Sequence, residues 1–262
     1  MKEKINNLFN INNEKNFIAI EGIQNNRNFD QNKIDFSISN LVAKKFNKNK
    51  IYPLSIDTWD EKELSALKNV ISSGNFTMGD RVKTFEQKFA CHLNTKYAVM
   101  VNSGSSANLL MISSLVYNDD IDLNEGDEVI VPSLSWATTY FPLKQCNLKA
   151  RFIDINIETL NIDSTKIENA ITKKTKAIFA VNILGNPVAF DEIKNICKRN
   201  NLILIEDNCE SLGAKYKGRY TGTIGIAGTY SFYFSHHIHT IEGGMITTND
   251  EKLYQHMLCL RA

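Results

Sequence analysis

From residue 97 onward, short apolar segments alternate with segments whose apolar residues recur at helical spacing. The strand-like segments are YAVMV, EVIVP, RFIDI, KAIFAVN and LILIED, at 97–101, 128–132, 151–155, 176–182 and 202–207, with two more at 228–233 and 245–248. Helical patterns occupy 105–117, 137–145 and 190–200, and another begins near Asp250 and is still running at the last residue. This alternation predicts an α/β fold with a mostly parallel sheet, of the seven-stranded type, sandwiched by helices.

Two more helices are predicted ahead of the first strand. One carries apolar residues from Leu64 to Ile71 and stops at Gly74, and the other carries a stripe from Val82 to Leu93. Ligands of such sheets bind outside the carboxyl ends of the parallel strands. The candidate site is therefore formed by the loops that follow Val101, Val131, Asn182, Ile205 and Tyr233.

The composition argues against several classes of protein. Apolar residues make up 43% and charged residues 23%, and the net charge of +1 gives no basis for a nucleic-acid or anionic-membrane partner. No apolar run reaches the roughly 18 residues of a membrane span, and the first residues lack the apolar segment of a secretory signal. The five cysteines are widely spaced without a C-x-x-C pair. This spacing argues against a disulfide framework or zinc ribbon and favours the cytoplasm.

The first 50 residues differ from the rest of the chain. They contain 13 Asn and 8 Lys, with apolar residues only in short clusters. This pattern predicts a low-complexity Asn/Lys-rich N-terminal extension, either a mobile arm or a loosely docked helix. The α/β domain is expected to occupy residues 51–262.

Polar and aromatic residues stand at three of the predicted strand ends. NSGSS, residues 102–106, joins a strand to a helix, where free N–H groups and the helix dipole favour an anion; a simple Ser N-cap is the alternative. Asp207 ends LILIED and is suited to pair with a protonated ring nitrogen, or to act as an N-cap or surface acid. Trp136 is placed to stack on a flat ligand, or to pack in the core.

The segment SFYFSHHIH contains three histidines, His236, His237 and His239. A zinc site needs three or four converging ligands, and histidines this close in sequence converge only in a tight loop. A single histidine is also suited to general acid–base catalysis near neutral pH. Both a metal site and an acid–base role are compatible with these residues alone.

Taken together, the motifs resemble those of the DegT/DnrJ-type nucleotide-sugar aminotransferases, which use pyridoxal phosphate (PLP). The resemblance runs from about Tyr52 to the last residue, and each motif falls at a predicted strand end. In order they are FTMG (76–79), NSGSSANLL (102–110), VPSLSWATT (131–139), LGNP (184–187), IEDNCESLGA (205–214), GTYSFYFSHH (228–237) and EGGMITT (242–248). The resemblance implies the large domain of a fold-type I PLP-dependent transferase.

The chain departs from the family pattern at one informative position. Family members end the segment matching SFYFSH in a lysine that bonds covalently to PLP, and here that residue is His236. The resemblance therefore implies noncovalently bound PLP, or its amine form PMP, with His236 as the catalytic base. A branch of the family that removes the 3-hydroxyl of 4-keto-6-deoxy sugars shares this replacement. His237 and His239 are expected to be structural.

The resemblance also assigns residues to the cofactor. Gly104, Ser105 and Ser231 are expected to bind its phosphate, and Trp136 to stack on the pyridine ring. Asp207 is expected to pair with the ring nitrogen. The last expected contact is Glu210, near the cofactor's polar edge.

The implied reaction is the 3-dehydration of a nucleotide-linked 4-keto-6-deoxy sugar, with glutamate restoring PMP. FTMG and SFYFSHH favour a GDP-linked sugar of the mannose series, in deoxysugar and lipopolysaccharide biosynthesis. The alternatives are a CDP-linked glucose-series dehydrase with an iron–sulfur cluster, in which Cys209 would be one ligand, and a zinc protein. A further alternative is an inactive fragment, because the family's C-terminal small domain would follow Ala262. Full-length members of the family form homodimers.

Overall fold

Residues 54–56 and 58–262 are described by the computed structural model. The predicted extension at residues 1–50 lies outside this part of the chain. Among the described helices, none is long and apolar enough to cross a membrane.

Seven strands form the main sheet, in the order β1-β9-β8-β5-β4-β2-β3. Their bounds are β1 Tyr97–Val101, β2 Glu128–Pro132, β3 Lys149–Ile153, β4 Thr175–Val181, β5 Ile203–Asp207, β8 Ala227–Ser231 and β9 Gly244–Thr248. Only β9 runs antiparallel to its neighbours β8 and β1; the other pairs are parallel. The predicted mostly parallel sheet is therefore confirmed.

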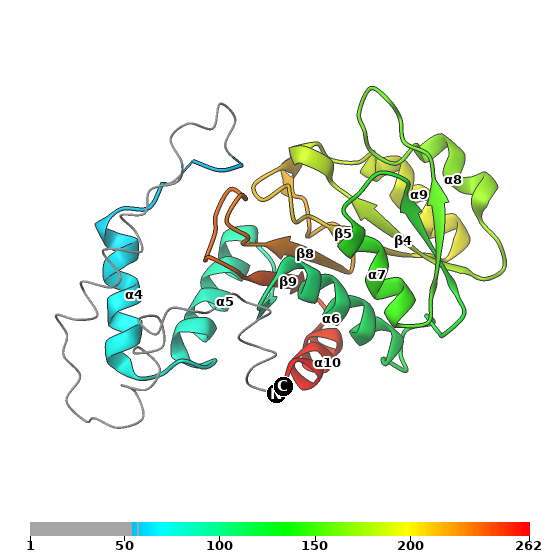
Figure 1. The fold of residues 1–262 in the computed structure, drawn as a ribbon. Helices are drawn as coiled ribbons and strands as arrows, with labels where there is room; N and C mark the ends of the chain where they lie inside the picture. Colours follow the sequence, from blue (N-terminus) through cyan, green and yellow to red (C-terminus); the bar gives the residue numbers. More distant parts are fainter. Residues whose placement is uncertain (1–53, 57) are drawn as a thin grey trace, which may run out of the picture. The chain divides into compact units, whose positions relative to one another are not determined.

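Helices cover both faces of this sheet (Figure 1). One face is covered by α6 (Gly104–Val116), α7 (Ala137–Gln145) and α10 (Glu251–Arg261), and the other by α5 (Asp80–Leu93), α8 (Ser164–Ala170) and α9 (Phe190–Asn200). The residues of β4 show why the sheet is apolar on both sides. Ala177 and Phe179 belong to the core beneath α6, whereas Ile178 and Ala180 belong to the core beneath α9.

The helix α4 (Glu61–Ser73) precedes this unit and has clear end signals. Asp60 and Glu63 form a capping box at its start, and Gly74 ends it with a left-handed φ of 66°. The predicted helix is thus confirmed, but none of its residues is fully buried.

Several short elements were not predicted from the sequence. The helix α8 contains one buried apolar residue, Ile167, so it has no periodic pattern to detect. Strands β6 (Lys215–Tyr216) and β7 (Arg219–Tyr220) form a two-residue hairpin around Lys217 and Gly218, which both have positive φ. A helical turn, η2 (Ile183–Gly185), follows β4.

A buried carboxylate holds the turn before β8 against the sheet. Glu206 is fully buried and accepts backbone N–H groups from Gly222 (2.6 Å), Ile224 (2.6 Å) and Gly225 (2.7 Å), as well as Nδ2 of Asn182 (3.2 Å). Burial raises the pKa of Glu206, and these hydrogen bonds oppose that rise. The carboxylate satisfies donors that would otherwise be buried without partners.

We expect Glu206→Gln to lower the free energy of unfolding by about 2 to 6 kcal/mol. The new amide NH₂ would face the Gly222 N–H and leave donors unpaired, each costing about 1–3 kcal/mol. Urea unfolding of the two proteins measures this loss. The control is Glu168→Gln at an exposed pair with Arg199, which should cost about 1 kcal/mol or less; equal losses in both variants would contradict the role of Glu206.

Candidate active site

A cavity of about 910 Å³ lies where the parallel strands end. The loops after β1, β2, β4, β5 and β8 all contribute to its lining. Every residue that the sequence predicts for the site lines this one cavity, namely Gly104, Ser105, Trp136, Asp207, Glu210, Ser231 and His236. The cavity thus lies where the strand-end rule predicts a ligand site.

The N-terminus of α6 offers unpaired backbone donors to the cavity. Ser103 is the N-cap, and its hydroxyl accepts the Ser106 N–H (3.1 Å). The N–H groups of Gly104 and Ser105 have no acceptor among the described residues. A Cβ on Gly104 would lie 2.6 Å from Cβ of Ser231, so only glycine fits so close to that serine. This corner can accept an anionic group.

Asp207 ends β5 and is only 6% exposed. Its Oδ2 accepts Nδ2 of Asn108 (2.9 Å) and Oγ1 of Thr139 (2.8 Å), and its Oδ1 accepts the Cys209 N–H (3.1 Å). The carboxylate is thus held between α6, α7 and its own strand. These three contacts fix the position of the carboxylate at the edge of the cavity.

Trp136 immediately precedes α7 and is 72% exposed. The alternative that it packs in the core is therefore wrong. Its indole is available to a flat ligand entering the cavity.

His236 is half-buried and lies near two carboxylates. Burial, its largest influence, lowers the pKa of His236; the charges of Glu210 and Asp207 oppose this, and His237 adds to it. A lowered pKa favours the neutral imidazole, which is the form able to accept a proton. Its backbone N–H donates to the Tyr233 carbonyl (2.9 Å), which fixes the turn that carries it.

The three histidines do not converge. His236 and His237 line the cavity, whereas His239 stacks on Trp59, with ring centroids 5.2 Å apart and planes at 8°. Within residues 54–56 and 58–262, no three His, Cys, Asp or Glu side chains are grouped to hold a metal ion.

Sequence reasoning missed two residues in the shell around Asp207, Asn108 and Thr139. Both are buried polar residues near the start of a helix. Asn108 stands in the otherwise apolar run ANLLMI, and a polar residue on a buried helix face was the signal that could have identified it.

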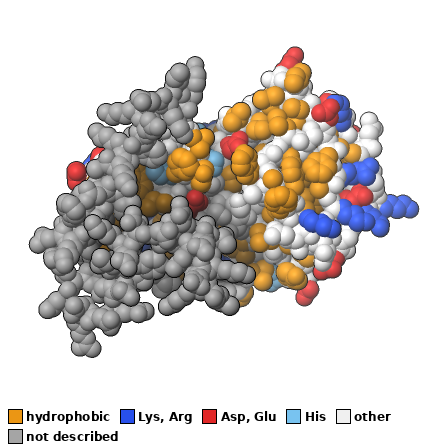
Figure 2. Space-filling model, in the orientation of Figure 1, with side chains coloured by type: hydrophobic (Ala, Val, Ile, Leu, Met, Phe, Trp, Pro, Cys, Tyr) orange, Lys and Arg blue, Asp and Glu red, His pale blue; other side chains and the backbone are white. Residues whose placement is uncertain are grey.

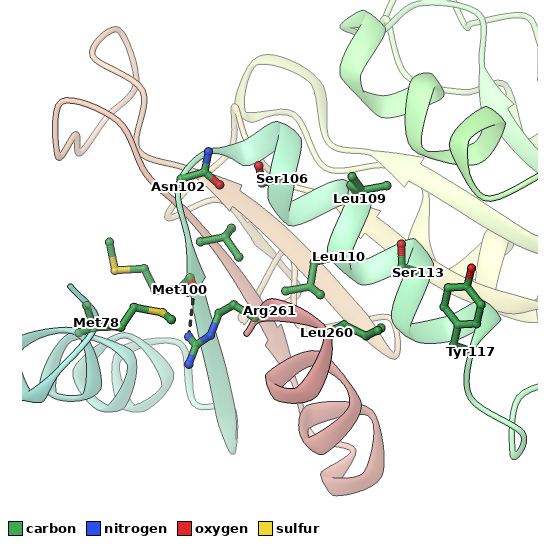
Figure 3. Close-up of a pocket in the computed structure, with 12 residues that line it drawn as sticks. Met78, Met100, Asn102, Ser106, Leu109, Leu110, Ser113, Tyr117, Leu260 and Arg261 are labelled. Atoms are coloured by element: carbon green, nitrogen blue, oxygen red, sulfur yellow. Dashed lines mark hydrogen bonds between the residues drawn. The ribbon is translucent and has the colours of Figure 1, made fainter.

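A second cavity, of about 590 Å³, is lined mainly by apolar residues of β1, α6 and the end of α10 (Figure 3). Arg261 lies at its edge, where it pairs with Glu86 (2.5 Å) and donates to the Met100 carbonyl (3.1 Å). None of the predicted site residues lines this cavity.

The model of the DegT/DnrJ/EryC1/StrS aminotransferase family matches residues 57–262. The chain therefore belongs to this family.

Within this family, the chain is similar to several GDP-4-keto-6-deoxy-D-mannose 3-dehydratases. The chain is 54% identical over 211 residues to GDP-4-keto-6-deoxy-D-mannose 3-dehydratase of Yersinia pseudotuberculosis, covering 80% of this chain and 54% of the relative. The solved E. coli GDP-4-keto-6-deoxy-D-mannose-3-dehydratase with bound hydrated PLP is 52% identical with a TM-score of 0.78, over 80% of this chain and 54% of that one. A GDP-4-keto-6-deoxymannose-3-dehydratase structure with a trapped PLP-glutamate geminal diamine has the same identity and TM-score, over 80% and 55%. The chain spans about half the length of the curated relatives it matches.

Removing the charge of Glu210 and removing the imidazole of His237 should shift the pKa of His236 in opposite directions. Glu210→Gln should lower the pKa of His236, because the Glu210 charge raises it, and His237→Gln should raise that pKa, because His237 lowers it. NMR titration of the imidazole C–H resonances, with His236→Gln for assignment, measures both shifts. Shifts of the same sign in both variants would contradict this electrostatic account.

Proposed function

We propose that residues 51–262 form the cofactor-binding large domain of a PLP/PMP-dependent 3-dehydratase. Its substrate would be a nucleotide-linked 4-keto-6-deoxy sugar, GDP-4-keto-6-deoxy-D-mannose. The observation that carries the proposal is the joint lining of one cavity by His236, Asp207 and the N-terminus of α6. Among the described lining residues there is no lysine.

The cavity fits the cofactor in three independent ways. Gly104 leaves a space that a Cβ would fill, next to the free N–H groups of α6, which suits a phosphate. Asp207 is a buried, hydrogen-bonded carboxylate suited to a protonated ring nitrogen. Trp136 presents an exposed indole to a planar ring. Glu210 would lie near the polar edge of the cofactor, and Ser231 would add a hydroxyl at the phosphate.

The chain's own residues divide the remaining work. When bound, the cofactor ring would supply an electron sink for breaking bonds on the substrate. Asp207 would hold the proton on the ring nitrogen. The neutral imidazole of His236 would accept a proton within the site and return it to the leaving hydroxyl. A histidine at this position leaves the cofactor free of a covalent bond to the chain.

Two relatives that are 54% and 52% identical to this chain are GDP-4-keto-6-deoxy-D-mannose 3-dehydratases, which favours a GDP-linked substrate. The iron–sulfur alternative would use Cys209 as a ligand. Burial, with a smaller contribution from the charge of Asp207, raises the pKa of this thiol well above its ordinary value.

Glutamate and a second copy of the chain complete the proposal. A relative's structure contains a PLP-glutamate adduct, which supports glutamate as the amino donor that restores PMP.

Hydrophobic side chains are exposed on the face of the molecule seen in Figure 2. Phe141 and Phe152 are exposed by 61% and 55%, which supports a homodimer that covers apolar surface. The reaction is proposed to take place in the cytoplasm and to serve surface-polysaccharide synthesis.

Replacing His236 by lysine should convert noncovalent binding into covalent binding. After addition of PLP and borohydride, His236→Lys should retain a pyridoxyl group through denaturation and desalting, whereas the wild-type chain should release its PLP. Mass spectrometry of the intact chain distinguishes the two. His92→Lys, on α5 and away from the cavity, is the control and should behave as wild type. Retention of a pyridoxyl group by the wild-type chain to the same extent as by His236→Lys would refute the noncovalent model.

Removing the imidazole should stop the reaction but not the binding. His236→Gln should lower the rate of dehydration of GDP-4-keto-6-deoxymannose, with glutamate present, by about 10²- to 10⁴-fold, as expected for a lost acid–base group. PLP affinity, measured by equilibrium dialysis, should change less than about threefold, since no bond to the chain is lost. His92→Gln is the matched control. Retained activity in His236→Gln would assign the proton transfer to another residue.

A further inference from the structure

The hydrogen bonds around Asp207 leave one acceptor position open. A carboxylate has about four lone-pair positions, two on each oxygen. Oδ2 receives two donors, from Asn108 and Thr139, and Oδ1 receives one, from the Cys209 N–H. Among the N–H and O–H donors, the unfilled position is therefore on Oδ1; the Cys209 thiol, a weak donor, also lies next to this carboxylate.

Asn108 is locked in one orientation. Its Nδ2 donates to the Thr138 carbonyl (3.2 Å) and to Asp207, and its Oδ1 accepts from Oγ1 of Thr229 (2.6 Å). Reversing the amide would place its carbonyl oxygen against the carboxylate. Because the residue is only 1% exposed, no water can compensate for that loss.

Thr139 belongs to a short chain of hydroxyl groups. Its Oγ1 lies 2.8 Å from Oδ2 of Asp207 and 2.7 Å from Oγ of Ser135. A carboxylate only accepts, so the single hydroxyl proton of Thr139 goes to Asp207, and Ser135 must donate to Thr139. Ser135 lines the cavity, so this chain links the cavity surface to the buried carboxylate.

We propose that Asn108 and Thr139 are positioning residues that saturate one oxygen of Asp207 and leave the other for a protonated pyridine nitrogen. They act through Asp207 and give the site its selectivity for a ring that carries such a nitrogen. This inference rests on the proposed function, because it assigns the two residues to the same cofactor site.

The test compares PLP with its 1-deaza analogue, in which a C–H group replaces the ring nitrogen. Dissociation constants for both are measured by equilibrium dialysis on the full chain, for wild type, Thr139→Val and Thr139→Ser. Thr139→Val keeps the shape but loses the hydroxyl, and should weaken PLP binding roughly three- to tenfold. Thr139→Ser keeps the hydroxyl and should restore PLP affinity to within about twofold of wild type. The deaza analogue should bind all three proteins equally.

Two further variants make the interpretation specific. In an Asp207→Asn background, Thr139→Val should cause no additional loss, because the two residues would act as one unit. Thr247→Val removes another buried threonine hydroxyl, one that donates to the Gly222 carbonyl (2.8 Å), and should leave PLP affinity unchanged. If Thr139→Val fails to fold, Ser135→Ala should show the same selective loss with a smaller size.

The outcomes separate this inference from the proposed function. Wild type that binds neither compound refutes the proposed function, and the inference with it. If wild type prefers PLP but Thr139→Val weakens both compounds equally, or neither, the cofactor site stands and the positioning role is refuted. A selective loss for PLP that the serine variant rescues supports both.

Discussion

The buried carboxylate of Glu206 and the backbone N–H groups around it are the interaction on which the site depends. They fix the turn 222–225, which leads directly into β8. Gly228 in that strand lies so close to the turn that a Cβ there would come within 2.1 Å of the Gly222 carbonyl oxygen. β8 in turn delivers Ser231 beside Gly104, at the α6 corner of the cavity. A carboxylate inside the sheet thus determines where the anion-binding corner closes.

The next residue in the chain, Asp207, faces the cavity rather than the turn that Glu206 holds. Side chains alternate along a strand, so neighbouring acids on β5 face different surroundings. Glu206 accepts backbone N–H groups and Nδ2 of Asn182 and does not line the cavity, whereas Asp207 lines it. The cavity accordingly combines N–H donors at α6 with carboxylate acceptors after β5. A ligand that carries both a phosphate and a protonated nitrogen satisfies the two together.

Much of this arrangement was predictable from the sequence. Strands such as 97–101 and 128–132 are apolar runs with clear ends. The position of the cavity follows from the carboxyl ends of these strands, without any knowledge of contacts between distant residues. The hydrogen bonds to Asp207 could not be predicted, because Asn108 and Thr139 lie 99 and 68 residues away in sequence, although the polar Asn108 in an apolar helix face was a signal of its own. The hairpin β6–β7 was not predicted for a different reason: each of its strands contains two residues, which is too short to show an alternating pattern. The roles assigned to the site residues stay predictions.

The antiparallel strand β9 has a consequence for the order in which the chain can fold. Within the described residues, β1 pairs with no strand other than β9, although the two are separated by about 140 residues in sequence. β8 and β9, by contrast, are joined locally. During synthesis, β1 therefore lacks its partner until residues 244–248 have left the ribosome, and long-range pairings of this kind form slowly. The α6 corner, which follows β1 and lies against Gly244, can therefore complete its packing only after these residues are available.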